Sequence, residues 1–144
     1  MAMDEFSKKV SAQIFSRFPE WECLAETAND EGVDVLSLKV PSLSDDESCH
    51  LTIDTFQGEV TVSFDAYHAH FCEFEGEALP FINQLISDDY AVVSYWRGEQ
   101  WCGSTLLPPD DFPATNKEYP YANRIKIRSW SGKLNDDIKC TPTD

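Results

Sequence analysis

The chain has 144 residues, of which 42% are hydrophobic, 12% aromatic and 26% charged, a composition typical of about one globular domain and not of a disordered chain. Its formal net charge of −15 excludes the basic surface that direct binding of nucleic acid or of an anionic membrane requires. A macromolecular partner of such a chain is expected to be basic.

In chain order, the spacing of apolar residues predicts one helix, four strands, a second helix and three further strands. The helices are expected at residues 4–18, where Pro19 ends the pattern, and at residues 77–90. The strands are expected at residues 21–27, 33–40, 50–56, 60–64, 91–97, 101–107 and 123–130.

The connections between these strands indicate the fold class. Short polar turns follow residues 56 and 97, and such turns join antiparallel hairpins. We therefore expect an α+β fold, in which an antiparallel sheet of about six to seven strands carries two main helices. The chain reads as a single domain over residues 1–144, with residues 135–144 as a frayed tail.

The cysteines and the missing targeting signals indicate a cytoplasmic protein. No run of 18 apolar residues and no secretion signal are present, so no membrane association is expected. The five cysteines are odd in number and contain no CxxC pair, which favours reduced thiols over disulfides or a zinc site.

Three histidines are the strongest candidates for chemistry. His68 and His70 share one face of a strand, and His50 lies on the neighbouring strand of the expected hairpin. With Cys72 nearby, they form a weak alternative metal site. If no bulge intervenes after residues 60–64, both would instead be half-buried on the core face, opposite Tyr67, as structural or interface residues.

Enzyme signatures are otherwise missing from the chain. It has no Gly-rich phosphate loop, no GxSxG elbow and no HExxH motif. Cys72 is followed by three glutamates, which disfavour a reactive thiolate. We therefore expect no catalytic residues and no cofactor.

Two further clusters favour binding or packing. Trp96, Arg97 and Trp101 flank the turn of the second hairpin, and these residue types are common both in interfaces and in cores. Arg124, Lys126 and Arg128 form a basic cluster in the last strand, which is too small to bind nucleic acid and is expected to form cross-strand ion pairs.

The negative charge is concentrated at one end of the sequence. Residues 1–77 carry a net charge of −13, whereas residues 78–144 carry −2. This imbalance predicts either an acidic binding face or the general acidity of many cytosolic proteins.

Four segments between residues 50 and 130 resemble a group of bacterial immunity proteins that are encoded beside polymorphic toxins of the contact-dependent inhibition and Rhs type. The segments are VTVSFDAYHAHF, ALPFINQLISDD, VVSYWRGEQWCGS and RIKIRSW. The resemblance implies a cytosolic α+β protein without catalysis, which binds a toxin domain, often a basic nuclease, and blocks its active or substrate-binding surface. It implies no oligomeric state.

We expect the partner to contact acidic residues of the first half together with the aromatic and histidine clusters. These residues are Asp45, Asp46, Glu47, Tyr67, His68, His70, Glu73, Glu75, Glu77, Trp96, Arg97 and Trp101. Two other functions stay open from the sequence: a small metal-dependent enzyme that uses His50, His68 and His70, and an acidic adaptor without a toxin partner.

Overall fold

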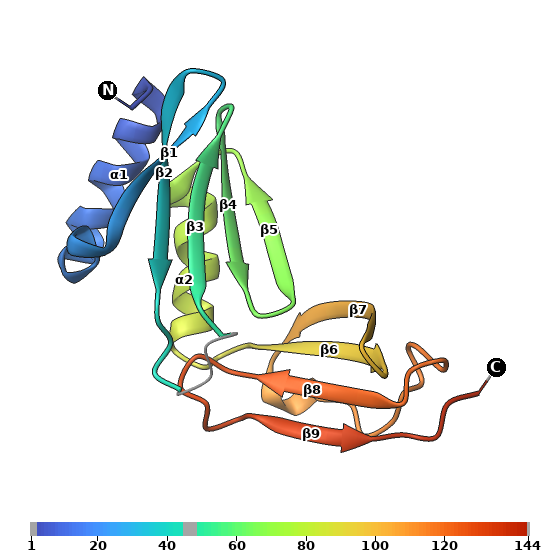
Figure 1. The fold of residues 1–144 in the computed structure, drawn as a ribbon. Coiled ribbons are helices and arrows are strands. Elements are labelled where there is room, and N and C mark those ends of the chain that lie inside the picture. The colour runs from blue at the N-terminus through green and yellow to red at the C-terminus, as the bar shows by residue number, and fades with distance from the viewer. Residues whose placement is uncertain (1–2, 45–48, 144) are drawn as a thin grey trace. The chain divides into compact units, whose positions relative to one another are not determined.

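The protein is an α+β fold with two antiparallel sheets, as seen in a computed structural model that describes residues 3–44 and 49–143 (Figure 1). The expectation of one sheet of six to seven strands is wrong, because the strands divide into a sheet of five and a sheet of four. The chain forms two compact units, which are described separately. The first comprises Met1–Pro41, His50–Phe64 and His68–Asn83, and the second Ser42–Cys49, Asp65–Tyr67 and Gln84–Asp144.

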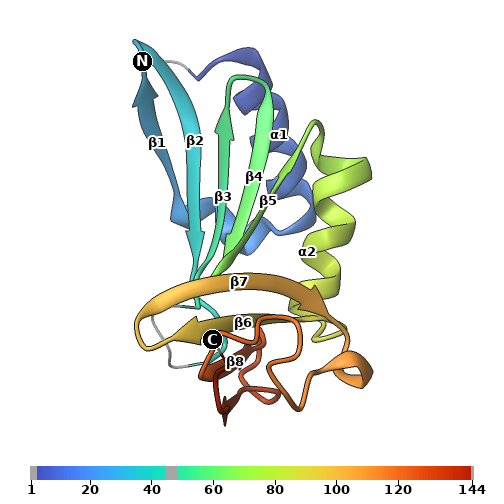
Figure 2. The same ribbon diagram turned by 90° about the vertical axis from the view of Figure 1, so that its right-hand side faces the viewer.

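Apart from Tyr67 at the start of β5, the first unit contains the five-stranded sheet, in the order β1-β2-β3-β4-β5 (Figure 2). Its strands are β1 (Ala25–Asp30), β2 (Val33–Val40), β3 (Leu51–Phe56), β4 (Glu59–Phe64) and β5 (Tyr67–Phe71). The hairpin expected around residues 57–59 is confirmed, with Phe56 paired to Glu59. The strand expected at 21–27 starts only at Ala25, because a 3-10 helix, η1 (Pro19–Leu24), precedes it and buries Trp21 against Phe18.

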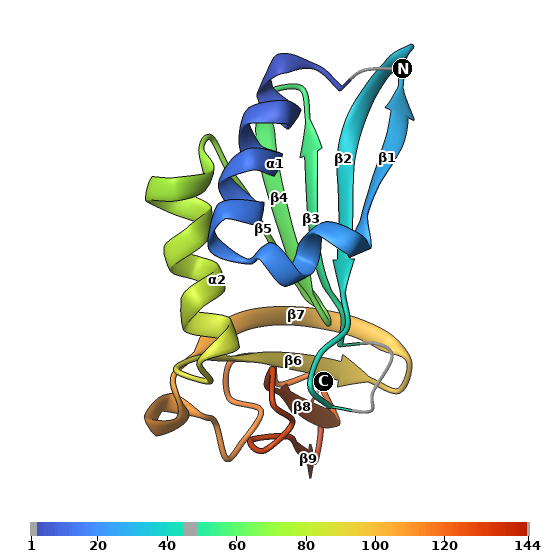
Figure 3. The same cartoon turned by 90° about the vertical axis from the view of Figure 1, so that its left-hand side faces the viewer.

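Helices cover one face of this sheet. Helix α1 (Glu5–Arg17) starts at Asp4, whose side chain accepts a hydrogen bond from the Ser7 amide, and it contacts β2 and β3 (Figure 3). The second expected helix is shorter than residues 77–90: a π-helical turn, η2 (Phe74–Ala78), leads into α2 (Leu79–Ile86).

A buried hydroxyl pair joins α1 to the sheet. The Ser7 and Thr55 hydroxyl oxygens lie 2.6 Å apart, and Thr55 Oγ1 also accepts a hydrogen bond from the Leu36 amide. Around them, alternate apolar residues of β2, β3 and β4 point to the helices and form the core of the unit. The opposite face of the sheet therefore carries the remaining, more polar positions.

The second unit contains the four-stranded sheet, in the order β7-β6-β8-β9. Its strands are β6 (Ala91–Arg97), β7 (Gln100–Leu107), β8 (Arg124–Arg128) and β9 (Asp136–Lys139), and a short 3-10 helix, η3 (Pro109–Asp111), follows β7. Tyr95, Ile125 and Ile127 form the centre of its core, over which Phe112 and Tyr119 of the proline-rich loop pack.

The C-terminal residues 136–139 are ordered as a strand, which corrects the prediction of a frayed tail. They form β9, which pairs with β8 in antiparallel register from Arg124–Lys139 to Ile127–Asp136. Asp137 receives hydrogen bonds from Arg124, at 2.8 Å from its Nη2, and from Arg128. The basic cluster of the last expected strand therefore does form cross-strand ion pairs, with a partner in this tail.

Charge is shared between the units more evenly than between the halves of the sequence. The first unit contains thirteen carboxylates and four basic residues, for a net charge of −9, and the second unit carries −6. All five cysteines lie in the described part of the chain, where none of them forms a disulfide. Among the described residues, no helix is both long enough and apolar enough to cross a membrane.

Candidate functional site

The face of the five-stranded sheet opposite α1 carries a row of polar side chains that crosses every strand. Glu26 pairs with Ser37, Ser37 with Asp54, and Asp54 with Thr61. The row ends on β5, where His70 Nδ1 lies 2.8 Å from the Thr61 hydroxyl. Because directly paired residues of antiparallel strands share a face, these five side chains lie side by side.

Further carboxylates and two exposed apolar side chains also lie on this face. Asp30 and Glu59 have the same parity along their strands as Glu26 and Thr61, so they lie on the same side of the sheet. Between them, Val33 is 41% exposed and Phe56 is 47% exposed. We call this surface the acidic face, and Lys39 is its one basic residue among those described. It is defined by Glu26, Asp30, Val33, Asp54, Phe56 and Glu59.

Asp54 is the carboxylate most affected by its surroundings. Burial raises the pKa of Asp54 above its ordinary value, although a hydrogen bond from Ser37 partly opposes this shift. A positive charge placed next to Asp54 would favour its charged form and so oppose the effect of burial.

His68 and His70 lie next to the acidic face, and both are exposed. The expectation that they continue the core face of residues 60–64 is wrong. A two-residue turn at Asp65–Ala66, with Asp65 at a φ of 51°, joins β4 to β5 and shifts the inward positions from even to odd numbers. On β5, Phe71 therefore packs on Phe81 of α2, on the side opposite the histidines, which is also the side of Tyr67.

The structure does not assemble the alternative metal site. His68 and His70 are in edge-to-face contact, with ring centroids 5.2 Å apart, and His70 Nδ1 lies 3.9 Å from Glu59 Oε2. Within the described residues, however, no three His, Cys, Asp or Glu side chains form a group that could hold a metal ion. His50 contributes nothing to such a group.

The predicted acidic contact residues have other positions. Asp45, Asp46 and Glu47 lie outside the described residues. Glu73, Glu75 and Glu77 lie in or beside η2, which contacts α1 on the helical side of the unit. Glu77 is used within the chain, because its Oε1 accepts hydrogen bonds from the Cys72 and Glu73 amides. The three glutamates thus lie on the other side of the unit from the acidic face.

Trp96 and Trp101 are brought together in the second unit, where they face each other across the β6–β7 hairpin. Trp101 is 54% exposed, and its indole donates a hydrogen bond to Ser104. Lys126 lies over the ring of Trp96, 4.8 Å from its centroid. Arg97 does not join this pair, since it stacks on Tyr121 and binds the Tyr121 carbonyl.

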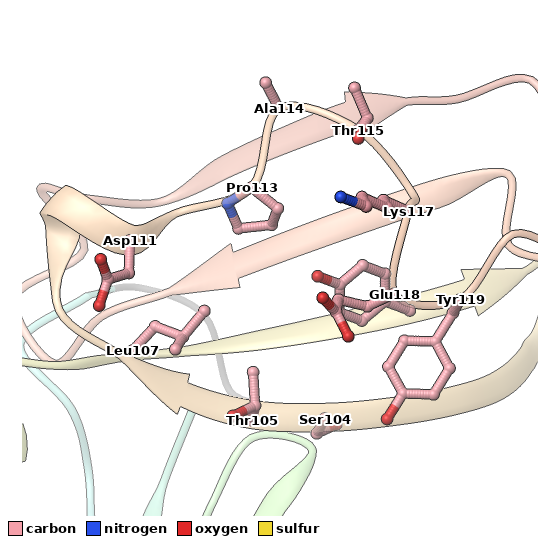
Figure 4. Close-up of a pocket in the computed structure, with 11 residues that line it drawn as sticks. Ser104, Thr105, Leu107, Asp111, Pro113, Ala114, Thr115, Lys117, Glu118 and Tyr119 are labelled. Carbon is pink, nitrogen blue, oxygen red and sulfur yellow. The ribbon is translucent and has the colours of Figure 1, made fainter.

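The second unit also contains a cavity of about 660 Å³ between β7 and the proline-rich loop (Figure 4). Thr105 and Leu107 line it from the strand, and Lys117, Glu118 and Tyr119 line it from the loop. Burial raises the pKa of the Tyr95 hydroxyl at this cavity, and the Glu118 carboxylate adds to the shift. The lining of the cavity combines a positively charged group, negatively charged groups and hydroxyl groups, and this combination does not indicate one class of ligand.

Comparison of the chain with protein-family models, with curated proteins and with solved structures gives no match.

Sequence reasoning missed every residue that defines the acidic face. The available signal was the alternation of the 50–64 hairpin, which already places Asp54, Phe56 and Glu59 on the face opposite Ile53 and Val62.

Proposed function

We propose that this chain is an immunity protein that binds and neutralises a basic, nuclease-type toxin domain, and that the acidic face is the surface it uses. The observation that carries the proposal is the composition of that face. Glu26, Asp30, Asp54 and Glu59 accompany one lysine, and exposed Phe56 and Val33 lie among them. Protein interfaces commonly combine apolar side chains that exclude water with charged and polar side chains that give specificity.

The mechanism is occlusion of a phosphate-binding surface. A nuclease must present Lys and Arg side chains to hold the backbone phosphates of its substrate. The carboxylates of the acidic face would pair with these side chains, while Phe56 would enter an apolar site and exclude water. Bound in this way, the immunity protein denies the nucleic acid access to the groove.

The net charge of −15 supports the kinetic side of this mechanism. An opposite charge on the toxin raises the rate of encounter, and that rate falls as salt screens the attraction. Fast association matters because each toxin molecule acts until it is bound.

Binding kinetics with the toxin domain encoded beside this chain test the proposal. In the variant E26Q/D30N/E59Q, the side chains keep their size and lose their charge. We expect the association rate at low salt to fall about tenfold and its salt dependence to flatten. In F56A, we expect the dissociation rate to rise by about tenfold or more.

E73Q/E75Q is the matched control, because it removes charge from the helical side of the same unit. It should associate nearly as fast as the wild type. Equal slowing by both charge variants would refute a role for the acidic face in particular. Failure of the wild-type chain to protect cells that express the toxin domain would refute the immunity function itself, whatever the binding data.

A further inference from the structure

The two edges of the five-stranded sheet differ in charge. β1 forms one edge and carries Glu26 and Asp30, whereas β5 forms the other and has the sequence Tyr-His-Ala-His-Phe. Proteins commonly guard an edge strand with charged residues, proline or a bulge, since its unpaired backbone groups can bind another strand. β1 has such a guard, and β5 has no Asp, Glu, Lys, Arg or Pro.

The helix beside β5 is also uncharged. α2 has the sequence Leu-Pro-Phe-Ile-Asn-Gln-Leu-Ile, and its Phe81 ring lies 5.4 Å from that of Phe71 at the end of β5. Pro80 and Asn83 of this helix are exposed. In a chain of net charge −15, β5 and residues 79–83 of α2 thus form a flank without charge, which we call the neutral flank.

The sequence of β5 is nearly the same when read in either direction. Ala69 is its centre, with a histidine on each side and an aromatic residue at each end. In a two-fold symmetric dimer, residue i contacts residue j while residue j contacts residue i, so a strand of this kind is complementary to itself. Antiparallel pairing of two such strands leaves no mismatched position.

We propose that two copies of this chain pair through β5, antiparallel and centred on Ala69, so that the five-stranded sheets join into one continuous sheet. In this register His68 lies opposite His70 of the second copy, on the open face, and Ala69 lies opposite its own equivalent. The two neutral flanks meet, and apart from Glu59, whose Oε2 lies 3.9 Å from His70 Nδ1, the carboxylates of each acidic face stay away from the two-fold axis. The pairing does not depend on the proposed function.

Sedimentation velocity of the full chain tests the pairing. A five-residue strand buries little area, so the dimer is weak and is sought from about 10 μM to about 1 mM chain at roughly 0.3 M salt, where repulsion between the acidic chains is screened. We expect a reversible monomer–dimer equilibrium. A monomer at every concentration would overturn the proposal.

Two double variants at the same exposed positions test the register. H68E/H70E places carboxylates opposite carboxylates at both cross-strand pairs, and we expect the dissociation constant to rise about tenfold or more. H68E/H70K places opposite charges at both pairs, so the dimer should persist. A dimer that is equally strong in H68E/H70E uses another surface and refutes the β5 pairing.

Disulfide trapping identifies the symmetry directly. With the exposed Cys23 and Cys72 replaced by serine, H68C and H70C should each stay uncrosslinked, because positions 68 and 68 of two copies lie on a diagonal. A mixture of the two variants should crosslink, since position 68 of one copy lies opposite position 70 of the other. Equal crosslinking of each variant alone would contradict this register.

Discussion

Gly103 in β7 lies directly beneath the ring of Tyr119, which closes the proline-rich loop over the second sheet. A Cβ built at Gly103 would collide with two ring carbons and the hydroxyl oxygen of Tyr119. The ring also packs on Tyr95, with centroids 4.7 Å apart, so displacing the ring would disturb its contact with the core. The missing side chain at this one position lets the loop contact the core.

G103A is therefore expected to destabilise the protein. Overpacking of a tight contact costs about 1–3 kcal/mol, and urea unfolding of the variant measures it. G76A is the control, because a Cβ at Gly76 would meet only the carboxylate end of the exposed Glu73 side chain, which can turn away. It should lie within about 0.5 kcal/mol of the wild type. Equal losses in both variants would show that Tyr119 is not the cause.

Single residues also decided which sequence predictions were right. The shared face of His68 and His70 is confirmed, because alternation along a strand is a local property. Their exposure was missed, since it depends on a two-residue turn at Asp65 that reverses the parity of the next strand. No residue between 64 and 67 is a glycine, so the turn lacked its usual signal.

At the scale of elements, β9 pairs with β8 and is joined to it by ion pairs whose acidic partner no local pattern indicates. Asp137 belongs to a short polar stretch. It forms ion pairs with Arg124 and Arg128, which both precede it by more than eight residues in the sequence. Burial alone would raise the pKa of Asp137, but the Arg124 hydrogen bond and the Arg128 and Arg124 charges outweigh it. The pKa of Asp137 therefore lies below its ordinary value of 3.8.

D137N is expected to loosen β9. A carboxylate with a lowered pKa stabilises the folded state at pH values above its unfolded pKa, and this contribution is lost as pH falls through the folded pKa. At pH 7, the amides of β9 should exchange faster in D137N, with a stability loss of about 0.5 kcal/mol, since the carboxylate is half exposed.

In urea unfolding, the difference between D137N and the wild type should shrink as pH falls below 4. D136N serves as the control, because an amide oxygen can still accept the Asp137 amide hydrogen bond that Asp136 accepts. A pH-independent difference would mean that the Arg contacts contribute nothing through charge.

Which strands form is more predictable than how they assemble. Both expected hairpins are present, because apolar alternation and turn residues are short-range signals. The division into two sheets was missed. It depends on β8 pairing with β6 rather than with a strand of the first hairpin. These two strands are about thirty residues apart, and neither strand's sequence indicates which strand it will pair with.

At the scale of the whole molecule, the fold redistributes the negative charge. The two parts of the sequence carry net charges of −13 and −2, whereas the two compact units carry −9 and −6. The chain crosses between the units several times, so neither unit coincides with a half of the sequence. Neither unit is neutral, and each carries carboxylates in excess of its basic residues. Self-repulsion is therefore a property of both units.

This repulsion predicts that added salt stabilises the protein. Raising sodium chloride from about 0.01 M to about 0.3 M shortens the screening length from roughly 30 Å to well under 10 Å, which weakens repulsion across a unit more than contacts within an ion pair. We expect the midpoint of thermal unfolding at pH 7 to rise. Near the pI of about 4.3, where the net charge vanishes, the same salt should have little effect. A fall of the midpoint with salt at pH 7 would mean that attractive pairs, such as those of Asp137, outweigh the excess of carboxylates, and the charge of −15 would then cost the fold nothing.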